Sequence, residues 1–250
     1  MKLTKIAVVM PALNAEATLE RTVADLPSGR DLDLILVDDA STDGTVEIAT
    51  RLGMHIVRHE ATLGYGANQK TCYVEALARG AEVVVMLHPD YQYDARLLGV
   101  MVDIIDADVC DIVLGNRIRT RSEALNNGMP LWKYLINRSS TFMENFLLGQ
   151  TLGEFHSGFR AYSREALERI PFPNNSDDFV FDQEILIQAA YFGLRIGDIP
   201  VPVRYMPEAS SINVRRSIRY GISTIGCLMA LLFKKLHLRS DPRFVEYIDR

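Results

Sequence analysis

The sequence predicts an α/β fold with a mixed, mostly parallel sheet. Five short apolar runs in the first half of the chain alternate with segments of helical character, as in parallel strands joined by helices. Acidic residues follow two of these runs: Asp38 and Asp39 come directly after residues 34–37, and Asp90 comes after residues 82–87, His88 and Pro89. Ligands of open α/β sheets bind at the carboxyl ends of strands, so these acids are placed to meet a nucleotide-type ligand. Turn and helix-cap roles are the alternative for Asp38 and Asp39.

The first strand and helix are predicted within residues 5–26. Residues 5–10 predict the strand, and their apolar run, residues 6–10, stops at Pro11 and is too short for a signal peptide. The turn that follows lacks the GxGxxG fingerprint, which argues against a Rossmann dehydrogenase. Asn14 is placed to cap a helix over residues 15–26.

A glycine-containing segment follows the second and third strands. Residues 34–37 and 55–58 predict these strands, with a helix over residues 45–52 between them. Gly64 and Gly66 then precede a helix over residues 67–79. Glycine lets backbone approach a ligand closely, and a helix amino terminus favours an anion. A simple helix-entry turn explains the same two glycines.

The fourth strand, residues 82–87, leads into a polar turn that contains His88, Asp90 and Gln92. Alternate residues of an extended segment share one face, so these three side chains are expected to point the same way. An oxygen-rich cluster with few protein ligands suits Mg²⁺ or Mn²⁺ held partly by a phosphate. The alternative for Asp90 is a purely structural role, because a single acid in the loop after a strand needs no ligand to explain it.

The second half of the chain is predicted to mix helices with short extended pieces. Residues 112–115 predict a fifth strand, residues 120–130 a mobile loop, and residues 152–163 a short extended piece. Prolines in residues 195–205 indicate an edge or irregular strand. Helices are expected over residues 95–106, 132–148, from about 164, and 179–193.

The carboxyl-terminal part carries a basic and apolar pattern. Residues 204–243 hold eight basic residues against two acidic ones, and Arg215, Arg216 and Arg219 share a helical face within residues 211–236. An apolar stripe along this helix fits either a membrane surface or packing against the protein's own core. The apolar run at residues 222–233 is too short to span a bilayer, which takes about 20 residues.

Composition narrows the class of protein further. The net charge of −5 argues against a general nucleic-acid binder. The three cysteines are far apart and show no CxxC spacing, so they predict reduced thiols of a cytoplasmic protein.

Six motifs together resemble a known family. In chain order they are PALNAEATL, LVDDASTDGT, TLGYGANQK, PDYQ, LGNR and HSGFRAY. The combination resembles the inverting glycosyltransferases of family 2, which have the GT-A fold, and among them the polyprenyl-phosphate sugar transferases of the dolichyl-phosphate mannose or glucose synthase type. The resemblance covers roughly residues 5–205, so a catalytic domain is expected over residues 1–205. The basic and apolar pattern predicts a helical segment over residues 206–250 for membrane-surface or oligomer contact.

The resemblance also implies roles for individual residues. The nucleotide site would comprise Pro11, Leu13, Glu16, Asp38, Asp39, Gly64, Gly66, Lys70 and Asp90. A divalent cation, Mg²⁺ or Mn²⁺, would be bound by His88, Asp90 and Gln92, and an acceptor phosphate by Arg117, Arg138, Ser139 and Arg160. Two positions depart from the family pattern, because Tyr65 replaces a usual basic residue and His88 replaces a usual acid.

The implied reaction transfers a hexose from a GDP- or UDP-linked donor with inversion. A polyprenyl phosphate acceptor would be largely ionised near neutral pH and would need no general base. A sugar hydroxyl acceptor, as in glycan elongation, would need a general base, and Asp182 or Glu184 is the candidate. The catalytic role of Asp90 would be to hold the cation that stabilises the leaving phosphate. A scaffold that binds nucleotide sugars without turnover is a third hypothesis, motivated by His88.

The protein is expected in the cytoplasm or on the inner membrane face.

Overall fold

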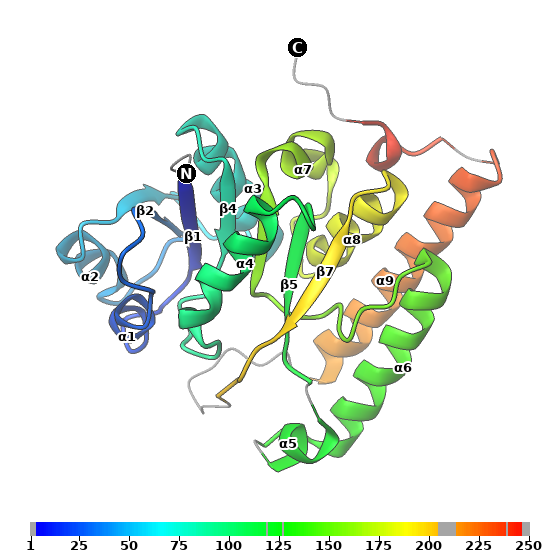
Figure 1. Cartoon of the computed structure of the whole chain (residues 1–250), viewed down its shortest axis with the longest axis horizontal. Coiled ribbons are helices and arrows are strands. Elements are labelled where there is room, and N and C mark those ends of the chain that lie inside the picture. Colours follow the sequence, from blue (N-terminus) through cyan, green and yellow to red (C-terminus); the bar gives the residue numbers. More distant parts are fainter. Residues whose placement is uncertain (1–3, 119, 127, 205–213, 239, 247–250) are drawn as a thin grey trace.

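The computed structural model describes residues 4–118, 120–126, 128–204, 214–238 and 240–246, without the side chains of residues 214–218. Within these residues a seven-stranded sheet lies between helical layers (Figure 1). The strands are β1 (Ile6–Ala12), β2 (Leu32–Asp38), β3 (His55–Arg58), β4 (Val83–Met86), β5 (Ile112–Asn116), β6 (Arg160–Ser163) and β7 (Ile196–Pro200). The predicted α/β class is therefore confirmed.

The sheet is mixed and mostly parallel, as predicted. Its order is β3-β2-β1-β4-β6-β5-β7, and β6 runs antiparallel to both β4 and β5. The extended piece predicted in residues 152–163 thus supplies the inserted strand that makes the sheet mixed. β7 pairs in parallel with β5 at the edge of the sheet, where Pro200 needs no second ladder partner.

Helices alternate with the strands along most of the chain. The α-helices are α1 (Leu19–Ala24), α2 (Thr45–Arg51), α3 (Tyr65–Ala78), α4 (Leu98–Asp106), α5 (Arg121–Asn126), α6 (Leu131–Leu148), α7 (Arg164–Arg169), α8 (Phe181–Tyr191) and α9 (Val214–Lys235) among the described residues. A 3₁₀ turn over Ala95–Leu97 precedes α4. α6 ends at Gly149, whose φ of 67° lies in the left-handed region that favours glycine.

Two predictions of local structure were wrong. Residues 120–130 contain α5 and are not a continuous loop. Asn14 does not cap a helix: α1 begins only at Leu19, and Asn14 Oδ1 accepts a hydrogen bond from the Thr42 N–H at 2.9 Å. Asn14 instead joins the segment after β1 to the segment after β2. A contact across 28 residues outweighed the local capping preference.

The sheet separates two apolar cores. Side chains of neighbouring strand residues point to opposite faces, so Ala7 and Val9 enter one core while Val8 and Met10 enter the other. The first core also holds residues of α3, α7, α8 and α9, and the second holds residues of α1, α2 and α4. This layering leaves the carboxyl ends of β1, β2 and β4 open at one edge, where a site can form.

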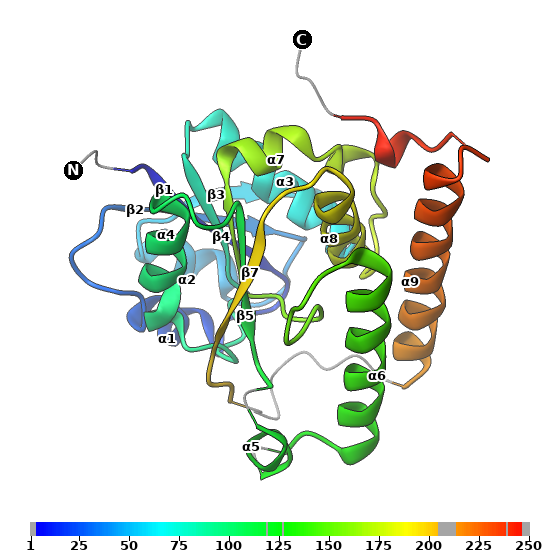
Figure 2. The same cartoon turned by 45° about the vertical axis from the view of Figure 1, so that its right-hand side comes forward.

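Helices α6 and α9 lie side by side at one side of the molecule in both cartoon views (Figures 1 and 2). Both carry exposed apolar side chains on their outer surfaces, including Leu135, Phe142, Ile222 and Ile225. Among the described residues, no helix is long and apolar enough to cross a bilayer. Arg215 and Arg216 lie among the residues whose side chains are not described.

Candidate active site

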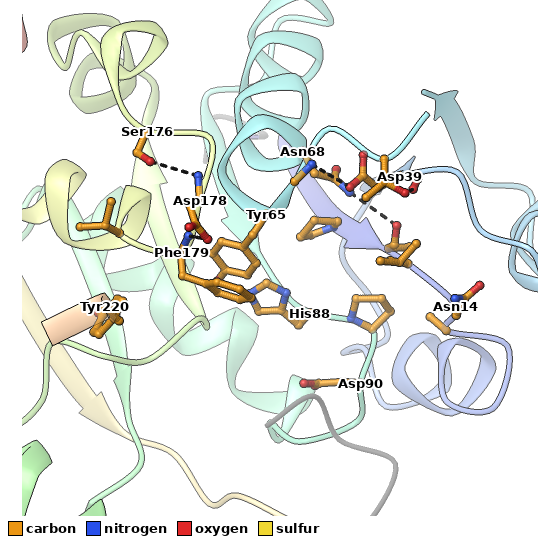
Figure 3. Close-up of a pocket in the computed structure, with 18 of the residues that line it drawn as sticks. Asn14, Asp39, Tyr65, Asn68, His88, Asp90, Ser176, Asp178, Phe179 and Tyr220 are labelled. Carbon is orange, nitrogen blue, oxygen red and sulfur yellow. Dashed lines mark hydrogen bonds between the residues drawn. The ribbon is translucent and has the colours of Figure 1, made fainter. Parts of the chain in front are cut away.

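A pocket of about 630 Å³ opens at the carboxyl ends of β1, β2 and β4. Six of the residues predicted from the sequence line it: Pro11, Leu13, Asp39, Gly64, His88 and Asp90. Figure 3 shows Asp39 and Asp90 at separate places around this pocket, and the rings of Tyr65, Phe179 and His88 gathered in a group apart from Asp39. Two acids from different strand ends therefore meet one cavity, as the sequence pattern predicted.

Asp39 lines the pocket, is buried and is already held by several donors. Its Oδ1 contacts His59 Nδ1 at 2.7 Å and accepts the Leu63 N–H at 2.9 Å, while Oδ2 accepts the Gly64 N–H at 3.1 Å. A carboxylate oxygen has two lone pairs, so Oδ2 can accept a further N–H from a ligand. Asp39 is thus both oriented by the protein and available to a ligand.

Asp90 forms no direct ion pair with a basic side chain among the described residues. Its Oδ1 accepts the Gln92 N–H at 3.1 Å. Burial raises the pKa of Asp90, although His88 and the Gln92 N–H act in the opposite direction. A desolvated carboxyl group of this kind is stabilised as an anion when a cation arrives with the ligand.

Tyr65 connects the pocket to the buried polar core. Its hydroxyl donates to Asp182 Oδ2 at 2.7 Å and lies 3.0 Å from His88 Nε2. Its ring stacks on Phe179 with a centroid distance of 4.7 Å. Tyr65 therefore supports the wall of the pocket on which His88 lies.

Three of the predicted nucleotide-site residues serve the scaffold around the pocket. Asp38 is buried, accepts the Ser41 N–H at 3.2 Å and pairs with Arg58 at 3.3 Å. Glu16 accepts the Gly44 N–H at the start of α2 at 2.6 Å. Lys70 pairs with Asp177 at 2.8 Å. None of the three lines the pocket.

Gly66 allows a close approach, but by the protein's own chain. A Cβ atom at this position would lie 2.4 Å from the Ser176 carbonyl oxygen, and the Gly66 N–H donates to the Asp177 carbonyl at 2.8 Å. The loop before α8 thus occupies the space beside the first turn of α3. It also supplies Ser176, Asp178 and Phe179 to the pocket.

The predicted acceptor-phosphate residues lie outside the pocket lining. Arg117 pairs with the buried Glu154, and although burial raises the pKa of Glu154, the Arg117 guanidinium lowers it below its ordinary value. Arg138 donates to the Gly153 carbonyl, and Ser139 is exposed on α6. Arg160 is fully buried, so it offers no surface to a phosphate here.

The predicted bases Asp182 and Glu184 are also engaged elsewhere. Asp182 lies 3.3 Å from the Arg160 guanidinium, and Glu184 accepts the Ser176 N–H at 2.6 Å and an Arg243 N–H at 2.8 Å. Neither residue lines the pocket. Gln92, the third predicted metal ligand, is likewise absent from the lining.

Several lining residues were not predicted from the sequence. Asn68 comes from α3, Phe179 and Asp178 from the loop before α8, and Arg219 and Tyr220 from α9. The arginine run of α9 was a signal of anion binding, but nothing local indicated that α9 reaches the pocket. That juxtaposition depends on the packing of α8 against α9.

The residues present fit a divalent cation that is held partly by its substrate. The described residues contain no group of three His, Cys, Asp or Glu close enough to enclose a metal ion. His88 and Asp90 nevertheless both line the pocket. Mg²⁺ is commonly bound by one or two protein groups plus substrate phosphates, and this donor set matches that arrangement.

A protein family and several known proteins are similar to this chain. A family model described as glycosyl transferase family 2 matches residues 7–171. The dolichyl-phosphate hexose transferase of Haloferax volcanii is 32% identical over 201 residues, which cover 80% of this chain and 82% of that protein. The UDP-N-acetylglucosamine–dolichyl-phosphate N-acetylglucosaminyltransferase of Methanococcus voltae is 27% identical over 238 residues, covering 87% of this chain and 94% of that protein.

A solved structure shares the fold. Glucosyl-3-phosphoglycerate synthase from Mycobacterium tuberculosis, in complex with Mn²⁺, uridine diphosphate and glucosyl-3-phosphoglycerate, has a TM-score of 0.67 and 22% sequence identity. The match covers 95% of this chain and 82% of that chain. The family model and the relatives thus agree with the mixed sheet and the pocket at its strand ends: the chain belongs to glycosyltransferase family 2 and is a glycosyltransferase with the GT-A fold.

Proposed function

We propose that this chain is an inverting transferase that moves a hexose from a GDP- or UDP-linked sugar to a polyprenyl phosphate. The observation that carries the proposal is the meeting of Asp39 and Asp90, from two strand ends, in one pocket. The names of two relatives, which act on dolichyl phosphate, support this acceptor class. The GT-A domain is proposed to span residues 1–205, followed by the basic helical segment of residues 206–250.

The donor is proposed to lie between the two acids. Asp39 Oδ2 would accept an N–H of the base, while Pro11 and Leu13 contact the nucleoside. Asp90 and His88, at the end of β4, would hold a divalent cation against the diphosphate. When bound, such a cation supplies stabilisation of the charge that develops on the leaving phosphate.

The two predicted bases, Asp182 and Glu184, already form ion pairs within the protein, which favours a phosphate acceptor. Asp182 and Glu184 are engaged with Arg160 and Arg243, so neither is free to take a proton from a sugar hydroxyl. A lipid phosphate needs no such base, because its second pKa is about 6. Arg219 is the one Lys or Arg among the described lining residues. Its exposed guanidinium lies 3.9 Å from Asp178 and is proposed to bind the acceptor phosphate.

Transfer to lipid phosphate tests this proposal directly. The full chain is incubated with Mn²⁺ or Mg²⁺ and labelled GDP-mannose, UDP-glucose or UDP-N-acetylglucosamine. The acceptor is polyprenyl phosphate or, in parallel, a glycan. We expect label in the lipid fraction with inverted anomeric configuration, and none with the polyprenyl alcohol, which lacks the phosphate. Label that enters only glycan acceptors would assign the chain to glycan elongation. Nucleotide-sugar binding without any turnover would support the scaffold hypothesis.

The outer surfaces of α6 and α9 are proposed to rest on an anionic membrane. Phe142 and Phe146 of α6 are 76% and 79% exposed, and α9 presents Ile222 and Ile225 alongside. Lys234 and Lys235 in the last turn of α9 supply positive charge to this surface. Arg219 and Tyr220 reach from α9 into the pocket, so a docked α9 would bring the pocket next to the lipid headgroups.

Liposome binding tests the membrane proposal. Binding to vesicles that contain anionic lipid should weaken as salt rises, because salt screens the basic residues. A Phe142→Ser, Phe146→Ser double variant should bind at least about tenfold more weakly, since two exposed apolar side chains no longer enter the interface. Val109→Ser, at an exposed site between α4 and β5, is the matched control. Absence of binding at every salt concentration would assign this surface to another occupant, such as a second copy.

A further inference from the structure

The two positions at which this chain departs from the family pattern are in direct contact. Tyr65 Oη lies 3.0 Å from His88 Nε2, and the two rings stack with a centroid distance of 5.4 Å. A Cβ atom at Gly158 would lie 2.7 Å from His88 Nε2, so glycine at this position leaves room for the imidazole. The replacements therefore form one local arrangement.

The partners of Tyr65 determine where its hydroxyl proton lies. Asp182 lies 3.3 Å from the buried Arg160 guanidinium, and its Oδ1 accepts Gln69 Nε2–H at 3.1 Å, so this carboxyl group acts as an acceptor. The Tyr65 hydroxyl donates its one proton to the other oxygen, Asp182 Oδ2, at 2.7 Å. The Tyr65 oxygen is then the acceptor for the second contact, at His88.

This assignment determines the tautomer of His88. To donate to the Tyr65 oxygen, the imidazole must carry its proton on Nε2. A neutral imidazole has one N–H, so the lone pair is on Nδ1. None of the described residues forms a hydrogen bond with His88 Nδ1, and the ring lines the pocket beside Asp90. A ring nitrogen left in this state is a metal donor.

We propose that His88 binds the divalent cation through Nδ1, next to Asp90, and that Tyr65 and Asp182 hold it in the required tautomer. Metal-binding histidines commonly donate their second N–H to an oriented acceptor, which Tyr65 supplies here. The inference rests on the proposed function only in that the cation arrives with a nucleoside diphosphate. Because imidazole is softer than carboxylate, the site should prefer Mn²⁺ over Mg²⁺ more strongly than a site with two acids.

Pulsed electron paramagnetic resonance of bound Mn²⁺ tests this ligand without measuring activity. The full chain is loaded with Mn²⁺ and uridine diphosphate and, separately, with Mn²⁺ and guanosine diphosphate. We expect modulation from a directly bound ¹⁴N nucleus in the wild-type chain and its loss in His88→Asp. His55→Gln, on the surface strand β3, should keep the signal. His88→Asp should also bind Mg²⁺ more tightly relative to Mn²⁺, by about tenfold.

The role of Tyr65 has its own readout. In ¹⁵N-histidine-labelled protein, nitrogen chemical shifts should show the Nε2–H tautomer of His88 in the wild type and a mixture of tautomers in Tyr65→Phe. The Mn²⁺ dissociation constant of Tyr65→Phe should rise about tenfold. An Nδ1–H tautomer in the wild type, or Mn²⁺ bound without ¹⁴N modulation, would overturn the inference. These results do not depend on the acceptor: ¹⁴N modulation without lipid glycosylation would leave the inference standing and reject polyprenyl phosphate.

Discussion

Asp90→Asn is expected to lower the rate of sugar transfer to polyprenyl phosphate by about 10²–10³-fold. The amide cannot supply the negative charge that holds a cation against the leaving diphosphate. Because Asp90 accepts only the Gln92 N–H at 3.1 Å among the described protein groups, the substitution leaves the turn after β4 with an isosteric acceptor. The rate is measured as label transferred from the donor to the lipid, at saturating Mn²⁺ and donor.

Asp94→Asn is the matched control for Asp90→Asn. It is the same substitution four residues further on, at a side chain that caps the 3₁₀ turn before α4 and lies outside the pocket. We expect nearly wild-type transfer from Asp94→Asn. Circular dichroism and thermal unfolding should show that both variants are folded. Wild-type turnover by a folded Asp90→Asn variant would remove Asp90 from the mechanism.

Arg160→Met is expected to lower the free energy of unfolding by about 3–5 kcal/mol, because it leaves a buried carboxylate without its partner. Arg160 is fully buried, lies 3.3 Å from Asp182 and donates to the Ser157 carbonyl at 2.7 Å. Methionine fills similar space but leaves these acceptors unsatisfied. Urea unfolding measures the loss, and the melting temperature should fall by on the order of 10 °C.

Arg51→Met provides the comparison for Arg160→Met. Arg51 pairs with Glu20 at 3.2 Å on the surface, and both side chains are largely exposed. We expect a change of about 0.5 kcal/mol or less, because exposed ion pairs contribute little. If Arg160→Met were as stable as Arg51→Met, the buried ion pair would not support the core beneath the pocket.

Local sequence pattern was sufficient for the strands and for the acids that follow them. Residues 55–58 were predicted and observed as a strand with the same bounds, and the run at 34–37 lies inside β2. An apolar run bounded by polar residues has few alternatives in a buried sheet, which explains this success. Predictions failed where distant contacts determine local structure, as at Asn14, which bonds Thr42.

The sequence by itself determined that acids end two central strands and that the chain is a family 2 glycosyltransferase. Only the tertiary structure decided which side chains enter the pocket. Asp38 and Asp39 are neighbours, yet Asp39 lines the cavity while Asp38 binds Ser41 and Arg58, because successive residues at a strand end point to opposite sides. In the same way, the packing of α8 and α9 brought Phe179 and Arg219 to the pocket and buried Arg160. Contacts between residues far apart in the chain depend on how whole helices and strands pack against one another. The local hydrophobic pattern of the sequence does not determine that packing.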